Sequence, residues 1–576
     1  MTSLTQKLSA ILGAAFETQD LPTRLGTVRI SDRPDLCQFQ CNGAMEAAKL
    51  AKKNPRQVAQ DVVANLEEPN PLANIEIAGP GFINVNVTDD CLLEYLNETH
   101  NDTHYGIEQT GTGQTIVLDY GGPNIAKPMH VGHLRSSIIG DSLRRILAIS
   151  GYQTIGDVHM GDWGTPMGMI LSELDITGHE GDVTMEQLAE IYPRAAADCK
   201  ADETRMEKAR AATKTLQDGD ETYTKRWRQF IDISIEGMKK NFDALGVHFD
   251  EWKGEADAHP FIAPMVEGFK NKNIASEDDG ALIVSVEQDD DKKEIPPLIL
   301  LKSDGAVMYS TTDLATIIDR IDSHDPAKII YIVDQRQSLH FEQVFRAALK
   351  GGIADEDKPE LIFAGFGTMN GTDGKPFKTR AGGVMKLEDL INMAVEKAHN
   401  RLNEANLADD VDEAEREDIA RKVALAAIKF ADLQNQRQSD YIFDLDRMTA
   451  FEGKTGPYLL YQAVRIQSLL KKADDKGFLN GNADITTIND NMRDLSLHLA
   501  QLPDAYAQAI KNYAPHVLCD HAYKLAQAFS SFYANSHILS ETDTQLRDSQ
   551  LALCTYAHKQ LVLILDMLGI KTPQRM

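Results

Sequence analysis

The alternation of short apolar strands with amphipathic helices in the middle of the chain is the feature that most restricts its fold. From Thr115 onward, short apolar strands are expected ahead of amphipathic helices. We expect the strands at Ile116 to Tyr120, Lys328 to Val333 and Glu360 to Ala364. Strands that alternate with helices form a parallel sheet with crossover helices. A charged, mostly helical stretch near residues 175–255 interrupts the pattern and is expected to be an insertion into this α/β domain.

The chain is too long for a single hydrophobic core. Cores stop growing at a few hundred residues, and this chain has 576. We expect a small α/β domain at residues 1–105, the parallel-sheet domain at residues 106–390 and a helical bundle at residues 391–576. The polar, glycine-containing stretch from Asn97 to Gln114 is the expected linker between the first two domains.

Composition argues against several classes of function. With 59 basic and 87 acidic residues, the formal net charge is −28, which opposes sequence-independent binding to a polyanion, so any nucleic-acid contact must use local basic patches. No stretch approaches the roughly 20 apolar residues of a membrane span, and the N-terminus lacks the features of an export signal. The six cysteines are scattered, so we expect neither protein-bound zinc nor disulfides, and a cytoplasmic location.

A turn rich in glycine and proline, between the first expected strand and the next helix, carries the most informative candidate site. Its sequence, Asp119 to His133, is DYGGPNIAKPMHVGH. Backbone N–H groups and the helix dipole at such a junction attract an anion, and phosphate is the expected occupant. His130 and His133 can donate hydrogen bonds to phosphate oxygens. Gly132 lets a flat purine approach the backbone, and Lys127 adds a cation. The alternative is an ordinary turn with a capping histidine.

The turn also carries a family resemblance. HVGH resembles the "HIGH" signature of class I aminoacyl-tRNA synthetases, and GGPNIAKPMHVGHLRS is similar to the form typical of the arginyl enzymes. The resemblance implies a Rossmann-like parallel-sheet catalytic domain with an additional N-terminal α/β domain and a C-terminal α-helical bundle. It further implies a ligase that activates L-arginine with ATP, releases pyrophosphate and transfers the arginyl group to tRNA(Arg), with the tRNA bound before activation.

Class I synthetases also carry a mobile lysine loop, usually written KMSKS, and this chain has GTDGKPFKTRAGG at Gly371 to Gly383 instead. This degenerate loop is similar to that of the arginyl enzymes. Lys375, Lys378 and Arg380 lie between glycines that permit closure over the ATP phosphates. The resemblance implies that Lys127 offsets the missing second lysine, and which lysine matters most stays open. The alternative is a solvated surface turn. The expected ATP-binding residues are Pro123, Gly132, His133 and Arg380.

The substrate arginine has a planar, always charged guanidinium, which needs a carboxylate and neutral acceptors in a forked geometry. The resemblance implies five arginine-binding residues, Asp119, Asn124, Tyr309, Asp313 and Gln337. It puts Tyr309, Asp313 and Gln337 on the guanidinium and the other two at the amino end. In our interpretation of the sequence, a strand ends at Tyr309 and a helix opens at Asp313. Asp313 is alternatively only an N-cap, and Gln337 only the end of the preceding strand.

Both ends of the chain resemble the tRNA-binding parts of arginyl enzymes. The stretches Phe451 to Lys472 and Leu568 to Met576 are similar to the anticodon-binding bundle, and the first hundred residues resemble the domain that contacts the outer corner of the tRNA. Tyr461, Arg465 and Lys472 lie opposite the apolar face of one helix, and they suit unstacked bases and phosphates. The alternative is a purely solvated helix face.

Other expectations complete this picture. Mg²⁺ would be carried by the ATP phosphates, the chain would be a monomer, and HMGDWGTPMG, His159 to Gly168, would be an ordered loop beside the ATP site. Two other classes of function stay open. One is another nucleotidyl-transfer enzyme with an HxGH turn, such as a cytidylyltransferase or a synthetase for a different amino acid, and the other is a non-catalytic RNA-binding paralogue.

Overall fold

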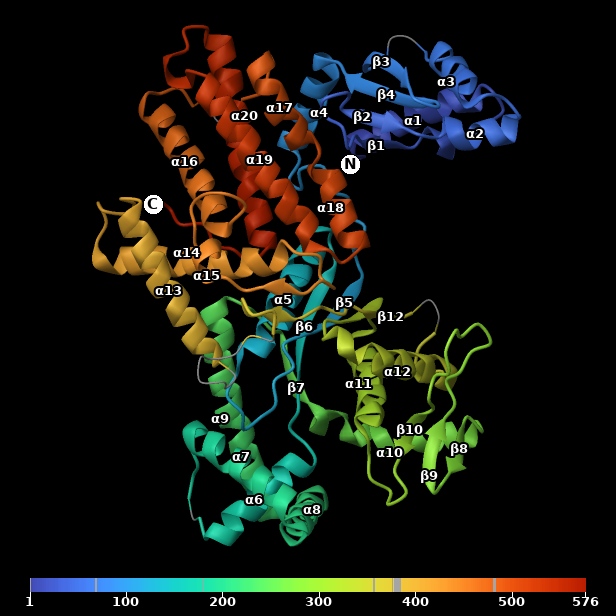
Figure 1. Ribbon diagram of the computed structural model, residues 1–576, viewed down its shortest axis with the longest axis vertical. Helices are drawn as coiled ribbons and strands as arrows, with labels where there is room; N and C mark the ends of the chain where they lie inside the picture. Colours follow the sequence, from blue (N-terminus) through green and yellow to red (C-terminus); the bar gives the residue numbers. More distant parts are fainter. Residues whose placement is uncertain are drawn as a thin grey trace. The chain divides into compact units, whose positions relative to one another are not determined.

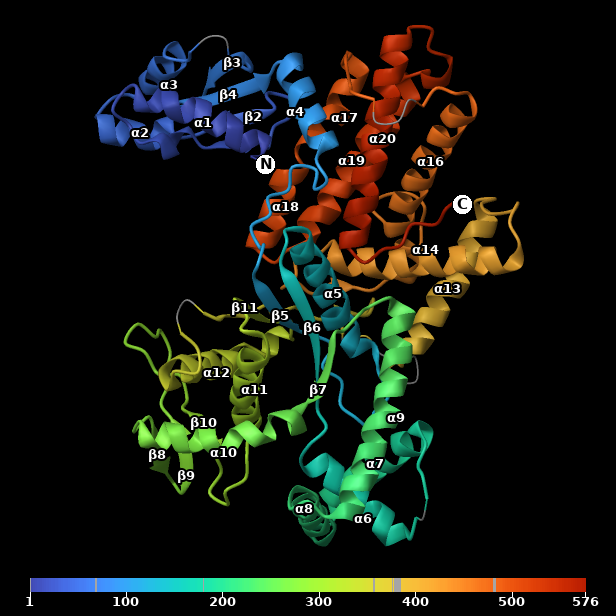
Figure 2. The ribbon, with the colours of Figure 1, turned by 180° about the vertical axis from the view of Figure 1, so that it is seen from behind.

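The computed structural model describes residues 2–67, 70–179, 181–355, 358–375, 377, 385–479 and 483–576. The chain divides into two compact units (Figures 1 and 2). We call residues 1–109, 458–566 and 572–576 the terminal unit, and residues 110–457 and 567–571 the central unit.

The terminal unit contains a four-stranded antiparallel sheet with the strand order β1-β2-β4-β3 and a set of long helices. The strands are β1 (Val28–Ile30), β2 (Phe39–Cys41), β3 (Leu72–Ala78) and β4 (Phe82–Val87). The helices before and after these strands are α1 (Leu4–Glu17), η1 (Thr23–Gly26), α2 (Ala44–Ala51), α3 (Pro55–Ala64) and α4 (Asp89–Asn101). The later helices are α16 (Gly456–Asp475), α17 (Asp490–Ala500), α18 (Leu502–Lys511), α19 (Pro515–Asn535), η4 (Ile538–Ser540) and α20 (Thr544–Met567).

Helix α1 shows how the sequence determines these elements. Ser3 caps the helix by accepting from the backbone N–H of Gln6, and the Gln6 side chain accepts from the backbone N–H of Ser3. This reciprocal arrangement satisfies two of the N–H groups that have no partner inside a helix. Leu4, Leu8 and Leu12 recur at helical spacing and are buried, so the N-terminus is part of the packed fold.

The central unit is built on a five-stranded sheet in the order β12-β11-β5-β6-β7, in which every neighbouring pair is parallel. Its strands are β5 (Thr115–Asp119), β6 (Gln153–Met160), β7 (Glu251–Gly254), β11 (Lys328–Tyr331) and β12 (Glu360–Phe363). The three strands expected from the sequence are confirmed, and β6 and β7 are additional. The central strand β5 is buried on both faces, as the uninterrupted apolar run Ile116 to Leu118 requires.

The helices of the central unit that follow the sheet strands include α5 (Leu134–Ile149), which packs beside β5 and β6 (Figure 1). The others are η2 (Val131–His133), α10 (Glu255–Asn271), α11 (Tyr309–His324), η3 (Gln335–Gln337), α12 (Ser338–Gly351), α13 (Leu387–Glu404), α14 (Glu413–Leu433) and α15 (Leu445–Met448). A small antiparallel sheet contains β8 (Ala275–Asp278), β9 (Ala281–Val284) and β10 (Leu298–Leu301), and a parallel pair contains β13 (Met369–Asn370) and β14 (Tyr441–Ile442).

The insertion between β6 and β7 is helical. Its helices are α6 (Thr165–Thr177), α7 (Met185–Ala201), α8 (Glu203–Gln217) and α9 (Glu221–Leu245). Helix α9 runs from the other three helices back toward the sheet, as both views show (Figures 1 and 2). Across the described residues of both units, no helix has the length and apolar character needed to cross a bilayer.

Candidate active site

The turn after β5 arranges its two histidines through backbone hydrogen bonds. The Gly132 N–H donates to His130 Nδ1 over 3.1 Å, and the His130 N–H donates to His133 Nδ1 over 3.2 Å. A ring nitrogen that accepts a hydrogen bond carries no proton, so each neutral imidazole carries its proton on Nε2. His130 is therefore a capping histidine, as the alternative interpretation had it, and the capping contact also leaves both Nε2–H groups as donors.

The electrostatic setting keeps these rings uncharged at neutral pH. Burial, followed by the neighbouring His130 ring, lowers the pKa of His133 to about 3. Burial and the nearby Lys127 lower the pKa of His130 as well. The two ring centroids are 4.1 Å apart, so two imidazolium charges would repel strongly there. The turn thus presents two neutral, oriented N–H donors next to a helix N-terminus, which suits an anionic ligand.

Residues 385–387 follow the lysine loop in sequence and are hydrogen-bonded to this turn; we call them the root of the lysine loop. The Val131 N–H donates to the Met385 carbonyl and the Leu387 N–H donates to the Met129 carbonyl, each over 3.1 Å. His130 and Lys386 form an antiparallel bridge between the two segments. Two parts of the chain that are about 250 residues apart in sequence are therefore joined by main-chain pairing.

The lysines themselves are placed only in part. Lys375 is exposed in the turn that follows β13, and its backbone N–H donates to Asp373 over 3.1 Å. Lys378 and Arg380 lie outside the described residues. Lys127 has its Nζ 4.5 Å from the centroid of the Tyr192 ring on α7, so the cation is held between the turn and the insertion.

Helix α11 begins earlier than the sequence suggested. Its N-cap is Met308 and its first residue is Tyr309, so the expectation that a strand ends at Tyr309 is wrong. Asp313 lies in the second turn and cannot cap the helix, and its carboxylate is 2.5 Å from His340 Nε2. The alternative for Gln337 is wrong as well, because β11 ends at Tyr331 and Gln337 is the exposed last residue of η3.

A carboxylate that the sequence analysis missed lies near Asp313. Glu255 is the first residue of α10, and its pKa is raised to about 8 by burial and then by the carboxylates of Asp162 and Asp313. Tyr309 is close enough to Glu255 for this carboxylate to raise the pKa of its phenol, after the effect of burial. Buried carboxylates that repel one another create a site for a cation. The only sequence signal was a Gly-Glu pair at the junction between β7 and α10, and β7 itself has no alternating pattern.

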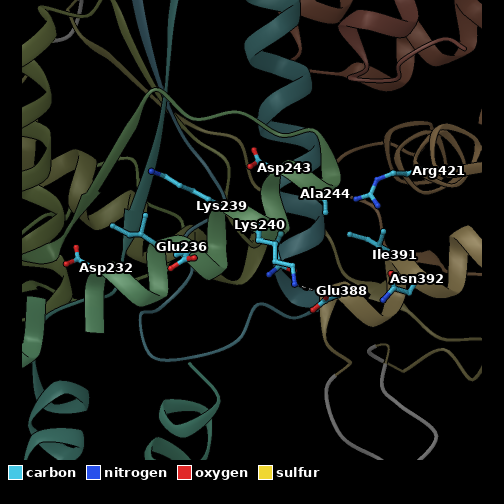
Figure 3. A pocket seen from close by; sticks show the side chains of 12 residues that line it. Asp232, Glu236, Lys239, Lys240, Asp243, Ala244, Glu388, Ile391, Asn392 and Arg421 are labelled. Atoms are coloured by element: carbon cyan, nitrogen blue, oxygen red, sulfur yellow. Dashed lines mark hydrogen bonds and ion pairs between the residues drawn. The ribbon is translucent and has the colours of Figure 1, made fainter. Parts of the chain in front are cut away.

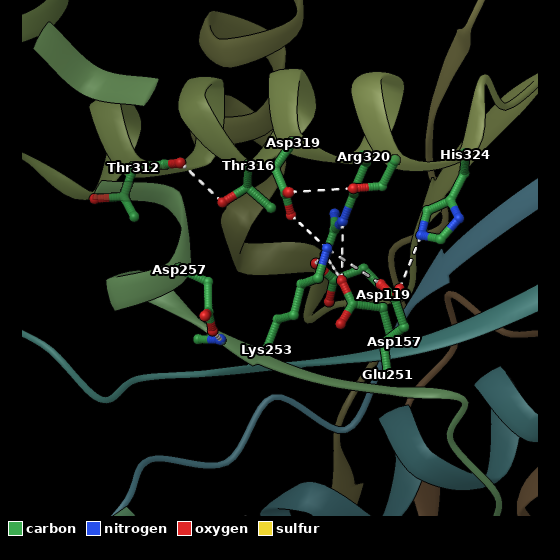
Figure 4. A network of polar contacts seen from close by, with 12 residues as sticks. Asp119, Asp157, Glu251, Lys253, Asp257, Thr312, Thr316, Asp319, Arg320 and His324 are labelled. Atoms are coloured by element: carbon green, nitrogen blue, oxygen red, sulfur yellow. Dashed lines mark hydrogen bonds and ion pairs between the residues drawn. The ribbon is translucent and has the colours of Figure 1, made fainter. Parts of the chain in front are cut away.

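The carboxylate of Asp119 is occupied by a buried ion pair (Figure 4). The guanidinium of Arg320, a fully buried residue of α11, lies 2.7 Å from Asp119 and 2.6 Å from Asp157 of β6. Lys253 pairs with Asp319 over 2.8 Å in the same network. Asp119 is expected at the amino end of the substrate, and in the structure one of its carboxylate oxygens is paired with Arg320.

The other expected residues lie on the same turn or in the terminal unit. Asn124 is exposed, Pro123 is buried, and Gly132 is exposed beside His130. In the terminal unit, Arg465 on α16 stacks its guanidinium 4.4 Å from the centroid of the Tyr533 ring. Tyr461 is partly exposed and Lys472 is exposed.

A separate cavity of about 770 Å³ lies between α9, α13 and α14 (Figure 3). Charged side chains of both signs line it, among them Lys239, Glu388 and Arg421, and Lys240 pairs with Glu388 over 3.2 Å. None of the expected site residues within the described part of the chain lines this cavity. Among the described residues, no group of three or more His, Cys, Asp or Glu side chains is arranged to hold a metal ion.

Comparison with known proteins agrees with this geometry. A family model described as "tRNA synthetases class I (R), catalytic domain" matches residues 97–445. Residues 97–445 therefore belong to the catalytic domain of a class I aminoacyl-tRNA synthetase. Models described as "Arginyl tRNA synthetase N terminal domain" and "DALR anticodon binding domain" match residues 2–87 and 459–576.

Whole-chain relatives specify the family. The chain is 49% identical to the arginine-tRNA ligase of Hyphomonas neptunium and 48% identical to that of Maricaulis maris, over 100% of both chains in each case. The crystal structure of the arginyl-tRNA synthetase of Plasmodium falciparum superposes with a TM-score of 0.83 at 25% identity, again over 100% of both chains. The chain belongs to the arginyl-tRNA synthetase family.

The buried ion pair of Arg320 leads to a first prediction. Replacing Arg320 by Met leaves the carboxylates of Asp119 and Asp157 buried without a cation, which costs about 3–5 kcal/mol of unfolding free energy. Urea unfolding measures this loss. Arg336→Met is the matched control, because its ion pair with Asp334 is exposed and contributes less than about 1 kcal/mol. Equal losses in the two variants would contradict the assignment of Arg320 as a structural centre.

Proposed function

We propose that the turn after β5, the lysine loop and the acidic end of α11 together carry out the arginine-tRNA ligase reaction, the activity of the family to which the chain belongs. In that reaction arginine is activated with ATP, and tRNA(Arg) is charged with it for translation. The observation that carries the proposal is the main-chain pairing of residues 129–131 with residues 385–387, which joins the histidine turn to the root of the lysine loop.

The ATP side of the proposed site uses neutral hydrogen-bond donors and lysine cations. His130 and His133 donate from Nε2 to the phosphate oxygens, where negative charge grows as the arginine carboxylate attacks the α-phosphate. Lys127, Lys375 and Lys378 offset the charge of the departing pyrophosphate. In the same proposal, Pro123, Gly132 and Arg380 contact the nucleotide, and Mg²⁺ is carried by the ATP phosphates.

The arginine side uses the carboxylates at the start of α10 and in the second turn of α11. Asp313 and the newly found Glu255 hold the guanidinium, since a charge-assisted pair relieves the repulsion between two partly buried carboxylates. Tyr309 and Gln337 supply neutral acceptors beside them. Asn124 binds the amino end of the substrate. Asp119 also binds the amino end in this proposal, through the carboxylate oxygen that is not paired with Arg320.

The tRNA side of the proposal rests on residue types and family membership. Tyr461, Arg465 and Lys472 on α16 combine aromatic and cationic groups, which suit stacking with bases and pairing with phosphates. Residues 1–105 would contact the outer corner of the tRNA, residues 106–390 would carry catalysis, and residues 391–576 would read the anticodon. The protein would act as a cytoplasmic monomer, with tRNA bound before activation.

A second prediction concerns the histidine pair. The double variant His130→Ala, His133→Ala lowers arginine-dependent pyrophosphate exchange, measured with tRNA present, by at least about 100-fold, the usual effect of losing one oriented donor. His248→Ala, which changes an exposed histidine of the same unit, is the control and keeps the wild-type rate. Undiminished exchange in the double variant would rule out the proposed role.

A third prediction tests the guanidinium pocket. Asp313→Asn keeps the shape of the side chain but removes its charge, so transition-state stabilisation with arginine falls by at least about 1.5 kcal/mol, the low end for a charge-assisted bond. The measurement is kcat/KM for arginine, and KM for ATP stays within about twofold of the wild-type value. Asp322→Asn, an exposed carboxylate on the same helix, is the control. An unchanged kcat/KM for arginine refutes the role of Asp313.

A fourth prediction follows from the raised pKa of Glu255, which is about 8. At pH 7 this carboxyl is mainly protonated in the absence of substrate, and the guanidinium binds the ionised form. Arginine binding therefore releases a proton, and KM for arginine falls as the pH rises from 7 to 9, by up to about tenfold per pH unit below the pKa. Glu255→Gln removes this component. Comparing KM for arginine against pH in the wild type and in Glu255→Gln separates the titration of Glu255 from that of arginine itself. Identical slopes in the two proteins would contradict the prediction.

A further inference from the structure

The loop Gly161 to Trp163, part of the HMGDWGTPMG stretch, touches both proposed ends of the amino-acid pocket. We propose that this loop fixes the distance between Asn124 and Glu255 and so selects arginine by length over guanidino amino acids with longer or shorter side chains. The inference rests on the proposed function, in which Asn124 binds the amino end and Glu255 the guanidinium. It makes Gly161 and Asp162 positioning residues, since they act through these two side chains.

At the amino end, the loop is paired with the turn that carries Asn124. The Gly161 N–H donates to the Pro123 carbonyl over 3.3 Å, and the Ile125 N–H donates to the Gly161 carbonyl over 3.2 Å. These two bonds form a parallel bridge between Asn124 and Gly161. A Cβ at Gly161 would lie 2.1 Å from Asn124 Oδ1, which no real contact allows. The position of the Asn124 side chain therefore depends on glycine at 161.

At the guanidinium end, the next two residues hold the start of α10. Asp162 is 2% exposed, and its Oδ1 accepts from the Ala256 N–H over 3.0 Å. The Trp163 backbone N–H is close enough to the Glu255 carboxylate to oppose part of the rise in its pKa. A Cβ at Gly254 would lie 2.5 Å from the Asp162 carboxylate. The loop thus fits closely against Gly254, the residue before Glu255, and is hydrogen-bonded to Ala256, the residue after it.

Aromatic side chains keep the loop itself rigid. The Trp227 indole on α9 donates from Nε1 to the Asp162 carbonyl over 2.7 Å. The Trp163 ring lies 5.2 Å from the Trp227 ring at 73°, and 5.7 Å from the His259 ring on α10. Edge-to-face contacts at these distances are favourable. The loop is therefore held by α9 and α10. Any shift of the loop that changed the distance between Asn124 and Glu255 would disturb its contacts with both helices.

A rigid connection between two binding groups discriminates by length, because a ligand with one methylene more or less cannot reach both groups in their best geometry. The contacts of the loop lie on residues proposed for the amino acid, which gives this stretch a specific role beyond that of an ordered loop beside ATP. The substrate class that the connection excludes is the set of guanidino amino acids longer or shorter than arginine by one carbon.

The test compares arginine with homoarginine, its analogue with one additional methylene. Gly161→Ala displaces Asn124, and Asp162→Ala releases the start of α10. In each variant the ratio of kcat/KM for arginine to that for homoarginine, measured by tRNA charging, falls by at least about tenfold, the low end of the effect of one methylene. KM for ATP stays within about twofold of the wild-type value. Thermal unfolding establishes that each variant is folded.

Arg135→Lys is the matched control, because Arg135 is equally buried in the central unit and pairs with Asp432 over 3.1 Å, away from both ends of the loop. Any loss of kcat/KM in Arg135→Lys affects arginine and homoarginine alike, so the ratio stays at the wild-type value. A ratio that stays at the wild-type value in Gly161→Ala and Asp162→Ala overturns the inference. Asn124→Ala and Glu255→Gln distinguish a failure of the proposed function from a failure of this inference. If neither variant changes kcat/KM for arginine, the proposed site is wrong. If both lower it while Gly161→Ala and Asp162→Ala keep the wild-type ratio of arginine to homoarginine, only the inference is wrong.

Discussion

A single buried guanidinium constrains the geometry of the central unit. Asp119, Tyr331 and Asp157 lie opposite one another on three neighbouring parallel strands. Arg320 pairs with both carboxylates and lies 5.2 Å from the centroid of the tyrosine ring. Asp313 is on the same helix, seven residues or about two turns earlier, and so faces the same way as Arg320. The helix cannot rotate or slide without breaking a buried ion pair, which fixes Asp313 relative to the ends of the strands.

The parts of the site that sequence reasoning predicted are those with local signals. The apolar run of β5, the glycine-rich turn and the helix that starts at Leu134 are adjacent in sequence, so their arrangement follows from period and turn chemistry alone. The pairing of residues 129–131 with 385–387 has no local signal, and only the family resemblance suggested that these segments meet.

The residues that were missed act through contacts between distant segments. Glu255 follows β7, a strand of four residues whose sequence EWKG carries no alternation, so the sequence pattern assigns the junction that carries this carboxylate to the insertion. The start of α11 differs from the prediction because Thr311 and Thr312, which are poor helix formers, lie in its first turn, where Thr311 is held by a hydrogen bond to the Leu300 carbonyl of β10. Local propensity is a weak guide where tertiary packing decides.

The neutrality of the histidine pair has a consequence for how the enzyme would tolerate acid. An imidazole with an ordinary pKa gains its charge between pH 7 and pH 6 and would then change the donor pattern around a triphosphate. His133, with a pKa of about 3, keeps the same proton arrangement through any acidification that a living cell survives. Carboxylates, among them Glu255 with its pKa of about 8, would therefore be protonated long before acidification reached His133.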